Sequence, residues 1–177
     1  MKNKIILVGH GGSGKDHLSN FLIREGYKKN VAYTTRPKRE GEVDGVDYNF
    51  ITTNDFEQKI NEKFWHEYNI FIPEKRWYYG SSKYNFEKCQ LFIKEPQGVS
   101  QLKKTERDKC LVVFININEN IRKERMLSRK KNADSVQRRI ESDRKDFKDF
   151  KDFDIEINDP NFDSVEVFKE IKKFLSL

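Results

Sequence analysis

Short apolar runs alternate with amphipathic stretches along most of the chain. Ile5–Val8, Leu91–Ile93 and Leu111–Ile115 are continuously apolar, which is typical of strands buried on both faces of a sheet. Ile155 and Ile157 indicate a further strand near the C-terminus. Stretches with helical spacing separate these runs. The pattern therefore predicts an α/β fold with a parallel central sheet.

Apolar residues at helical spacing place the helices. The predicted helices cover residues 15–25, 54–61, 98–103, 119–131, 134–151 and 163–175. Asn54 is the expected N-cap of the second helix, because Glu57 follows three residues later as in a capping box. Phe147, Phe150 and Phe153 are expected to place one aromatic edge on the core.

The segment between the first helix and residue 90 has a different character. Its pattern predicts short strands at 31–33 and 46–50, and two more strands within 64–80 that are joined by a loop at Pro73. Trp65 and Trp77 stand in an aromatic-rich stretch, so we expect them in a core rather than on a base-stacking surface.

A glycine-rich loop connects the first strand to the first helix. Residues 9–16 read GHGGSGKD and contain the pattern Gly-x-x-x-x-Gly-Lys. Glycines allow backbone N–H groups to turn around a phosphate, the helix N-terminus adds partial positive charge, and Lys15 supplies a full one. The candidate ATP-binding residues are Gly9, Gly11, Gly12, Ser13, Gly14, Lys15 and Asp16.

Asp16 stands where the phosphate-binding loop normally has a serine or threonine that contacts Mg²⁺. A carboxylate is a hard oxygen ligand and is a candidate for binding Mg²⁺ directly or through water. An acidic residue near a helix start also stabilises the helix by itself. Both roles are open from the sequence.

Composition narrows the function classes. The 177 residues suit one domain, and 36% are apolar while 36% are charged. Cys89 and Cys110 lie far apart beside apolar runs, which predicts buried thiols in a reducing compartment. No apolar stretch has membrane-spanning length and the start shows no signal-peptide pattern, so we expect a cytoplasmic protein that does not bind a membrane. The net charge is +6, but the lysines and arginines are spread along the chain and alternate with acidic residues. This pattern argues against nucleic acid as a partner.

A second candidate site lies in residues 34–50, TTRPKREGEVDGVDYNF. Arg36 and Arg39 are suited to hold a phosphate with forked donors, and Tyr48 offers a hydroxyl. A nucleoside monophosphate needs such a site in addition to a loop that holds the triphosphate. The acidic residues of the segment are expected to pair with the two arginines when no ligand is present. They are Glu42, Asp44 and Asp47.

These residues resemble the guanylate kinase family. The pattern Thr-Thr-Arg-x-x-Arg-x-Gly-Glu-Val-Asp-Gly-x-Asp-Tyr-x-Phe is similar to its GMP-binding signature, and residues 78–81 are similar to its Tyr-Tyr-Gly-Ser/Thr element. Residues 97–99 and 158–159 resemble further family elements, so the likeness covers essentially the whole chain. The Gly-Lys-Asp ending of the loop also resembles phage-type deoxynucleoside monophosphate kinases.

The resemblance implies a P-loop NTP hydrolase-type fold, with a three-layer α/β/α core, an inserted monophosphate-binding region and a helical lid. The implied ranges are 1–33, 89–121 and 145–177 for the core, 34–88 for the inserted region and 122–144 for the lid. The implied reaction transfers the γ-phosphoryl group of ATP, with Mg²⁺, to GMP or dGMP. A monomer or homodimer that binds small nucleotides is expected.

The resemblance also implies roles for individual residues. The implied catalytic residues are Lys15, Arg36, Arg125, Arg129 and Arg139. The implied monophosphate-binding residues are Arg36, Arg39, Tyr48, Glu67, Tyr78, Ser81 and Glu95.

Some positions depart from the family pattern. Ala32 replaces a serine that contacts the guanine, and His66 aligns as well as Glu67. One acid of the family's Asp-x-Asp strand is missing, and Glu95 stands for the other. These departures bear on base selectivity more than on phosphoryl transfer. A deoxynucleoside monophosphate kinase of broader specificity is therefore an alternative. A non-enzymatic scaffold is disfavoured, because such domains usually lose the intact loop that Gly14 and Lys15 preserve.

Overall fold

The fold is that of a computed structural model, which describes residues 1–72, 75–128 and 135–175. The chain forms two compact units. Unit 1 comprises Met1–Lys29 and Gln90–Leu177, and unit 2 comprises Asn30–Cys89. Unit 2 includes the whole of the predicted inserted region, residues 34–88.

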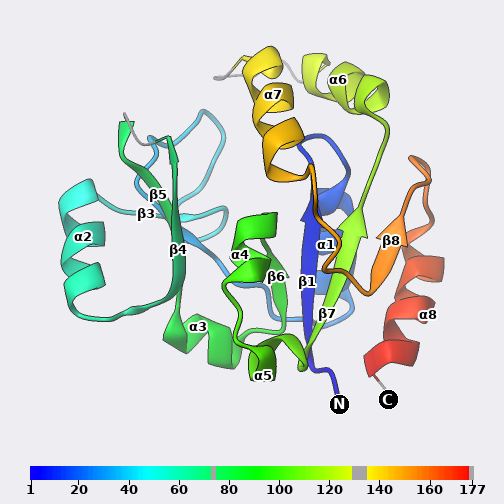
Figure 1. Cartoon of the computed structure of the whole chain (residues 1–177), viewed down its shortest axis with the longest axis horizontal. Helices are drawn as coiled ribbons and strands as arrows, with labels where there is room; N and C mark the ends of the chain where they lie inside the picture. The colour runs from blue at the N-terminus through cyan, green and yellow to red at the C-terminus, as the bar shows by residue number, and fades with distance from the viewer. Residues whose placement is uncertain (73–74, 129–134, 176–177) are drawn as a thin grey trace. The chain divides into compact units, whose positions relative to one another are not determined.

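Unit 1 is built on a four-stranded parallel sheet (Figure 1). The strand order is β6 (Leu91–Ile93), β1 (Lys4–Gly9), β7 (Cys110–Ile115) and β8 (Ile155–Ile157). β1 and β7 are buried along nearly their whole length, because their continuous apolar runs place side chains on both faces. The sequence prediction of a parallel α/β fold is confirmed.

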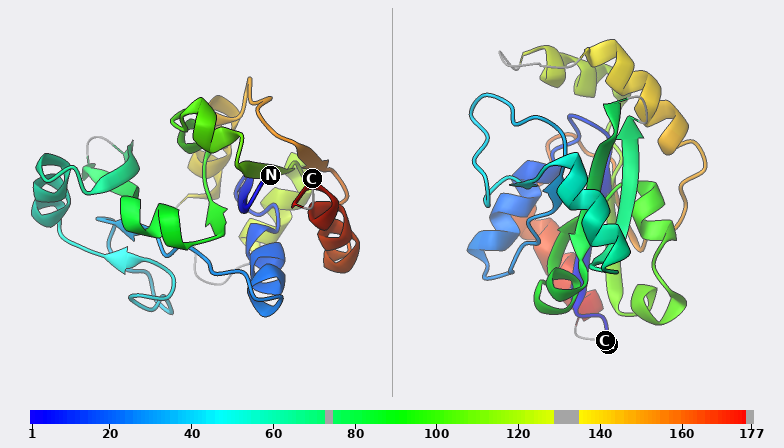
Figure 2. Two further views of the ribbon diagram at one scale, coloured as in Figure 1. Left: turned by 90° about the horizontal axis from the view of Figure 1, so that it is seen from below. Right: turned by 90° about the vertical axis from the view of Figure 1, so that its left-hand side faces the viewer.

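Helices surround this sheet. Those of unit 1 are α1 (Lys15–Arg24), α4 (Pro96–Ser100), α5 (Lys104–Arg107), α6 (Glu119–Leu127), α7 (Val136–Asp146) and α8 (Ser164–Leu175). α1 and α8 lie on one face and α4 lies on the other (Figure 2). The core between the sheet and the helices α1 and α8 contains Leu18, Leu22 and Ile171, all fully buried. This arrangement places the loop after β1 at the carboxyl edge of the sheet, where ligands of such sheets bind.

The opposite face carries the predicted aromatic edge. The rings of Phe147, Phe150 and Phe153 surround Phe114 of β7, with centroids 5.7, 5.2 and 5.4 Å from it. Both cysteines are buried free thiols, as predicted. No helix among the described residues combines the length and the apolar character that crossing a membrane requires.

Unit 2 contains a second, mixed sheet. Its strand order is β3 (Asn49–Phe50), β2 (Tyr33–Thr34), β5 (Trp77–Ser82) and β4 (Trp65–Ile72). Two helices accompany it, α2 (Thr53–Asn61) and α3 (Lys83–Lys88). Phe56 of α2 stacks between Trp65 and Tyr78, with ring centroids 4.0 and 4.8 Å away. Trp65 is therefore a core residue, as expected, and Trp77 is half-buried beside Lys75.

Several predicted boundaries were wrong. The strand expected at 46–50 covers only Asn49–Phe50, because residues 45–47 form a turn in which Gly45 has φ +76°. α2 is capped by Thr52, whose Oγ1 accepts from the Asp55 amide, and not by Asn54. The helix expected at 98–103 is replaced by α4 and α5, which begin at Pro96 and Lys104. A proline is favourable at the first position of a helix, and this explains the earlier start of α4.

Candidate active site

The loop between β1 and α1 has the backbone that its glycines predict. Gly12 and Gly14 have φ values of +77° and +106°, which other residues rarely adopt. A Cβ atom on Gly12 would also lie 2.8 Å from the carbonyl oxygen of Arg122. The loop thus depends on glycine both for its turns and for its contact with α6. Lys15 opens α1, and its Nζ donates to the carbonyl oxygens of Gly9 and His10.

A carboxylate from α7 contacts this loop. Asp143 Oδ2 accepts from the Gly11 amide at 2.9 Å and from Arg122 Nη1 at 3.0 Å. Arg122 is 3% exposed, and its Nε donates to the Ile117 carbonyl at 2.8 Å. Burial raises the pKa of Asp143, and the Gly11 amide and Arg122 oppose that rise. Burial also lowers the pKa of Arg122 despite its acidic partner. Desolvation therefore outweighs the attraction within this pair.

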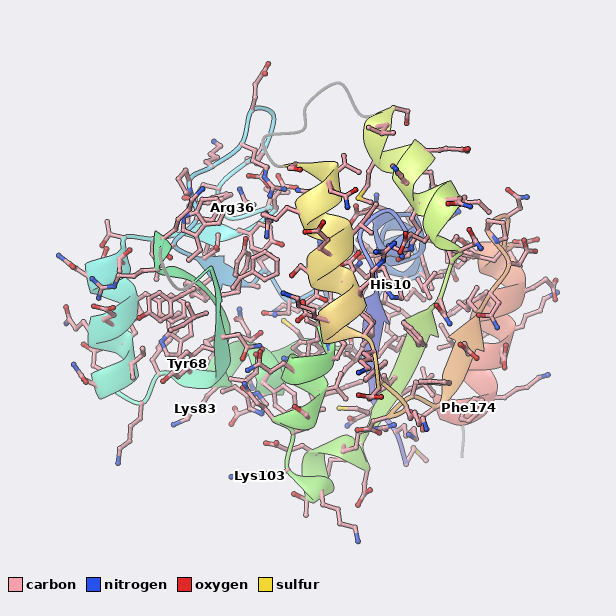
Figure 3. The ribbon with its side chains drawn as sticks, turned by 45° about the horizontal axis from the view of Figure 1, so that its top comes forward. His10, Arg36, Tyr68, Lys83, Lys103 and Phe174 are labelled. Carbon is pink, nitrogen blue, oxygen red and sulfur yellow. The ribbon has the colours of Figure 1, made fainter. Side chains whose placement is uncertain are left out.

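His10 lies inside the loop, where its ring stacks on Phe147 with centroids 4.0 Å apart (Figure 3). Burial, together with the charges of Arg122 and Lys15, lowers the pKa of His10 to about 4. The imidazole is thus neutral at physiological pH. This environment fits a packing role for His10 better than that of a catalytic base.

Two of the three predicted lid arginines lie on the helices α6 and α7. Arg125 of α6 is half-buried and donates to the carbonyl oxygens of Gly12, Ser13 and Pro160, at 3.3, 3.4 and 2.6 Å. Arg139 lies in the second turn of α7 and is half-buried. Arg129, the third predicted arginine, lies outside the described residues. Of the two that the structure describes, Arg125 is the one whose hydrogen bonds to the glycine-rich loop are seen.

Asp16 is exposed in the first turn of α1, and the helix has no side-chain cap at its start. Asp16 therefore makes no capping hydrogen bond, but its charge in the first turn still stabilises the helix. An exposed carboxylate beside Lys15 also fits a hard cation bound together with nucleotide phosphates, so both roles stay open. Among the described residues no cluster of three or more His, Cys, Asp or Glu side chains forms a metal site. A cation at this place needs most of its oxygen ligands from the nucleotide and water.

The second site lies in unit 2 around Arg36, which is 3% exposed (Figure 3). Its guanidinium donates to both carboxylate oxygens of Glu42, at 2.9 and 2.7 Å, and its Nε donates to Tyr79 Oη at 3.1 Å. The guanidinium also lies over the Tyr48 ring, 5.4 Å from its centroid. Burial disfavours its charge, but Glu42 and Tyr79 raise the pKa of Arg36 above its ordinary value.

The acidic residues of the segment divide into two groups. Glu42 pairs with Arg36 as predicted and also accepts from the Arg39 amide at 2.7 Å, and these contacts lower its pKa although burial opposes them. Asp44 and Asp47 were expected to pair with arginines. They accept instead from the backbone amides of Phe50 and Val43, at 2.8 and 2.7 Å. Their short side chains serve the turns of the loop, which is a common use of aspartate.

β5 presents its two tyrosines to opposite faces, because side chains alternate along a strand. Tyr78 faces α2, where its hydroxyl donates to Glu57 Oε1 at 2.8 Å and its ring stacks on Phe56. Tyr79 faces the other way and contacts Arg36 and the Tyr48 ring. The structure therefore does not bring Tyr78, which the sequence analysis selected, to Arg36. It brings its neighbour Tyr79. The available signal was Ser81, because alternation within β5 places Tyr79, and not Tyr78, on the same face as that predicted site residue.

Ser81 lies two residues beyond Tyr79, on the same face, and is paired in register with Glu67 of β4. Ser81 is 3% exposed and its Oγ accepts from Asn30 Nδ2 at 3.0 Å. His66, which aligned as well as Glu67 with the family acid, stacks on Phe86 of α3 at a centroid distance of 3.6 Å. The imidazole of His66 is packed against α3. The geometry therefore favours Glu67 over His66 as the counterpart of the family acid.

Glu95 belongs to unit 1. It is the N-cap residue of α4, two residues after the end of β6, and its side chain is exposed without capping the helix. It follows Lys94, which is buried and lies over the Phe92 ring at 5.7 Å. Glu95 thus stands at the carboxyl edge of the parallel sheet, the edge that also carries the glycine-rich loop.

Comparison with known proteins decides the family. Residues 1–176 match the guanylate kinase family. The chain belongs to the guanylate kinase family.

Relatives and a solved structure agree with this assignment. A guanylate kinase of Helicobacter pylori is 33% identical over 183 residues, which cover 98% of this chain and 87% of the relative. A guanylate kinase of Chlorobium luteolum is 32% identical, covering 97% of this chain and 92% of the relative. The crystal structure of guanylate kinase from Anaplasma phagocytophilum is similar in fold, with a TM-score of 0.71 at 21% identity, covering 99% of this chain and 85% of that one.

Within this guanylate kinase family member, the sequence analysis missed four residues that contact the candidate sites. They are Asn30, Tyr79, Arg122 and Asp143. Arg122 and Asp143 contact a loop that is more than 100 residues away in the sequence, so no local pattern marked them.

Proposed function

We propose that the chain transfers the γ-phosphoryl group of ATP to GMP or dGMP, giving ADP and the corresponding diphosphate. The observation that carries this proposal is one face of the unit 2 sheet. Arg36, Tyr48 and Tyr79 supply donors for a phosphate there, and the pair of Ser81 and Glu67 lies beyond them on the same face. Residues two apart on a strand are separated by about 7 Å, which suits a ligand with a phosphate at one end and a base at the other.

The side chains expected to contact the base, Glu67 and Ser81, favour guanine. A carboxylate accepts hydrogen bonds, so Glu67 matches the ring N–H and amino group of guanine. A hydroxyl donor beside it matches the carbonyl oxygen of guanine. Adenine presents an amino group and an unprotonated ring nitrogen instead, and it would leave both protein groups mismatched.

The phosphate of the acceptor would take up the guanidinium of Arg36 that now pairs with Glu42. Arg39 lies three residues further along the same loop, where its forked donors are suited to the same phosphate. We assign the tyrosine contacts to Tyr48 and Tyr79, and we no longer assign one to Tyr78, whose hydroxyl bonds to Glu57.

ATP would bind to the glycine-rich loop of unit 1, with its outer phosphates at Lys15. Mg²⁺ would be held by Asp16 together with the ATP phosphates, and it would neutralise charge on the transferred group. Arg125 and Arg139 would add positive charge from α6 and α7, and Glu95 would reach the acceptor from the end of β6. Lid closure over residues 122–144 would exclude water, which otherwise competes as the acceptor. Catalysis of this kind rests on positioning and electrostatics and needs no covalent intermediate.

A broader deoxynucleoside monophosphate kinase is the second candidate, because Ala32 lacks the hydroxyl that this family presents to guanine. An ADP-release assay over GMP, dGMP, AMP, dTMP and dCMP separates the two. We expect turnover with GMP and dGMP at kcat/KM values at least 100-fold above the others. Similar values for several bases would favour the broader enzyme, and no turnover with either guanine nucleotide would exclude the proposed function.

A further inference from the structure

Ser81 belongs to a chain of three polar side chains that lies entirely within unit 2. Asn85 Nδ2 donates to Asn30 Oδ1 at 3.0 Å, and Asn30 Nδ2 donates to Ser81 Oγ at 3.0 Å. Asn30 and Ser81 are 5% and 3% exposed. Water therefore has little access, and the direction of each hydrogen bond is decided by the protein.

The direction of this chain is fixed at its far end by the backbone. Asn85 Nδ2 also lies 3.3 Å from the carbonyl oxygen of Val31, which can only accept. The amide nitrogen of Asn85 must therefore point towards Asn30. Asn30 must present its oxygen to Asn85 and its nitrogen to Ser81.

The consequence falls on the Ser81 hydroxyl. An amide N–H cannot accept a hydrogen bond, so Ser81 Oγ must accept from Asn30, and its own hydrogen remains available to donate. Within the part of the chain that the structure describes, the hydrogen bond from Asn30 is the one recorded for Ser81 Oγ. A buried hydroxyl is worth most when its hydrogen meets an acceptor, so this polarity favours a ligand that offers one.

We propose that Asn30 is a positioning residue that sets base selectivity by holding Ser81 as a hydrogen-bond donor toward the nucleobase. The proposal rests on the proposed function, since it assigns the base to the face that carries Ser81 and Glu67. Asn30 stands two residues before Ala32, the position at which this chain lacks the serine hydroxyl. A polar side chain is thus present close in sequence to that position.

Asn30→Asp tests the proposal with a side chain of the same shape. A carboxylate accepts at both oxygens, so it keeps the bond from Asn85 and obliges Ser81 to donate to it. Ser81 then presents lone pairs to the base. We expect KM for GMP to rise about 10-fold with kcat nearly unchanged, because the base and not the reacting phosphate loses a contact. The ratio of kcat/KM for GMP to that for AMP should fall by about 10-fold or more.

Asn49→Asp is the matched control. Asn49 is half-buried in the same unit and donates to the same Val31 carbonyl at 2.8 Å, and Ser81 is not among its recorded partners. It should leave the ratio unchanged. Asn30→Ala removes the constraint without reversing it, so its ratio should lie between those of the wild type and Asn30→Asp. Thermal unfolding of each variant, with a melting point within a few degrees of the wild type, shows that the fold is retained.

The outcomes distinguish this proposal from the proposed function. Turnover of GMP by the wild type with an unchanged ratio in Asn30→Asp would overturn the role of Asn30 alone. A wild type that does not phosphorylate guanine nucleotides would exclude the proposed function. In that case binding of GMP and AMP, followed by tryptophan fluorescence, would still test Asn30, and equal preference in the wild type and Asn30→Asp would overturn it.

Discussion

Two candidate anion sites in this protein are each occupied by a carboxylate of the chain itself. In unit 1, Asp143 accepts from the Gly11 amide and Arg122. In unit 2, Glu42 accepts from Arg36 with both oxygens. The pKa shifts differ in sign. Asp143 and Arg122 are both shifted against their charged forms, whereas Arg36 and Glu42 are both shifted toward theirs.

The difference follows from how each site is built. Arg36 and Glu42 are six residues apart in one loop, and their fork-to-fork geometry repays the cost of burial. Asp143 and Arg122 lie on separate helices and share a single close contact of 3.0 Å. We infer that the carboxylate of unit 1 is the easier one for a nucleotide phosphate to displace, and that the pair in unit 2 keeps Arg36 oriented until a phosphate arrives.

Replacing Arg36 should have the largest effect. Arg36→Ala removes the forked donors from the acceptor phosphate, so kcat/KM for GMP should fall about 1,000-fold, while the dissociation constant of ATP should stay unchanged. Steady-state kinetics and calorimetry measure the two quantities. Arg36→Lys keeps the charge without the fork and should fall between the wild type and Arg36→Ala. A fall in kcat/KM of less than 10-fold in Arg36→Ala would show that Arg36 does not bind the acceptor phosphate.

Sequence reasoning found most of the fold and the local parts of both sites. The glycine-rich loop, the parallel strands and the Arg36–Glu42 pair are encoded by residues that are close in sequence or strictly periodic. The choice of Tyr78 over Tyr79 failed because the resemblance gave the motif but not which side chain faces Arg36. Asp143 could not be predicted, because its contact with Gly11 joins residues 132 positions apart and depends on how α7 packs.

The neutral state of His10 should appear in the pH dependence of stability. Its pKa is lowered from 6.5 to about 4 in the folded chain, so the unfolded chain binds the proton first as the pH falls. The contribution of His10 to the free energy of unfolding should fall by about 2 kcal/mol between about pH 7 and about pH 4, after discounting for the partly exposed ring. Urea unfolding of the wild type and His10→Phe, which keeps the stacking on Phe147, measures the difference.

His17→Phe is the control for this measurement, because His17 is exposed and its ring meets Phe162 at an edge. It should lose stability with falling pH as the wild type does. An equal pH dependence in His10→Phe and the wild type would show that His10 is not held neutral.

Removing Asp143 should have the smallest of these effects. Asp143→Ala frees the Gly11 amide for a phosphate, so the dissociation constant of ATP should fall by up to about 10-fold. Glu141→Ala, an exposed acid on the same helix, removes the same charge without touching the loop and should change the constant less than 2-fold or so. Isothermal calorimetry measures both. Weaker ATP binding in Asp143→Ala would mean that the carboxylate supports the loop rather than competing for it.

The most direct test of the account follows the phosphoryl group itself. ATP labelled in its γ-phosphate is mixed with excess enzyme and GMP, and the products of a single turnover are separated. The account predicts that the label moves into GDP, and that it does so far more slowly with Lys15→Ala and with Arg36→Ala. Label that stays in ATP or appears as inorganic phosphate in the wild type would contradict it.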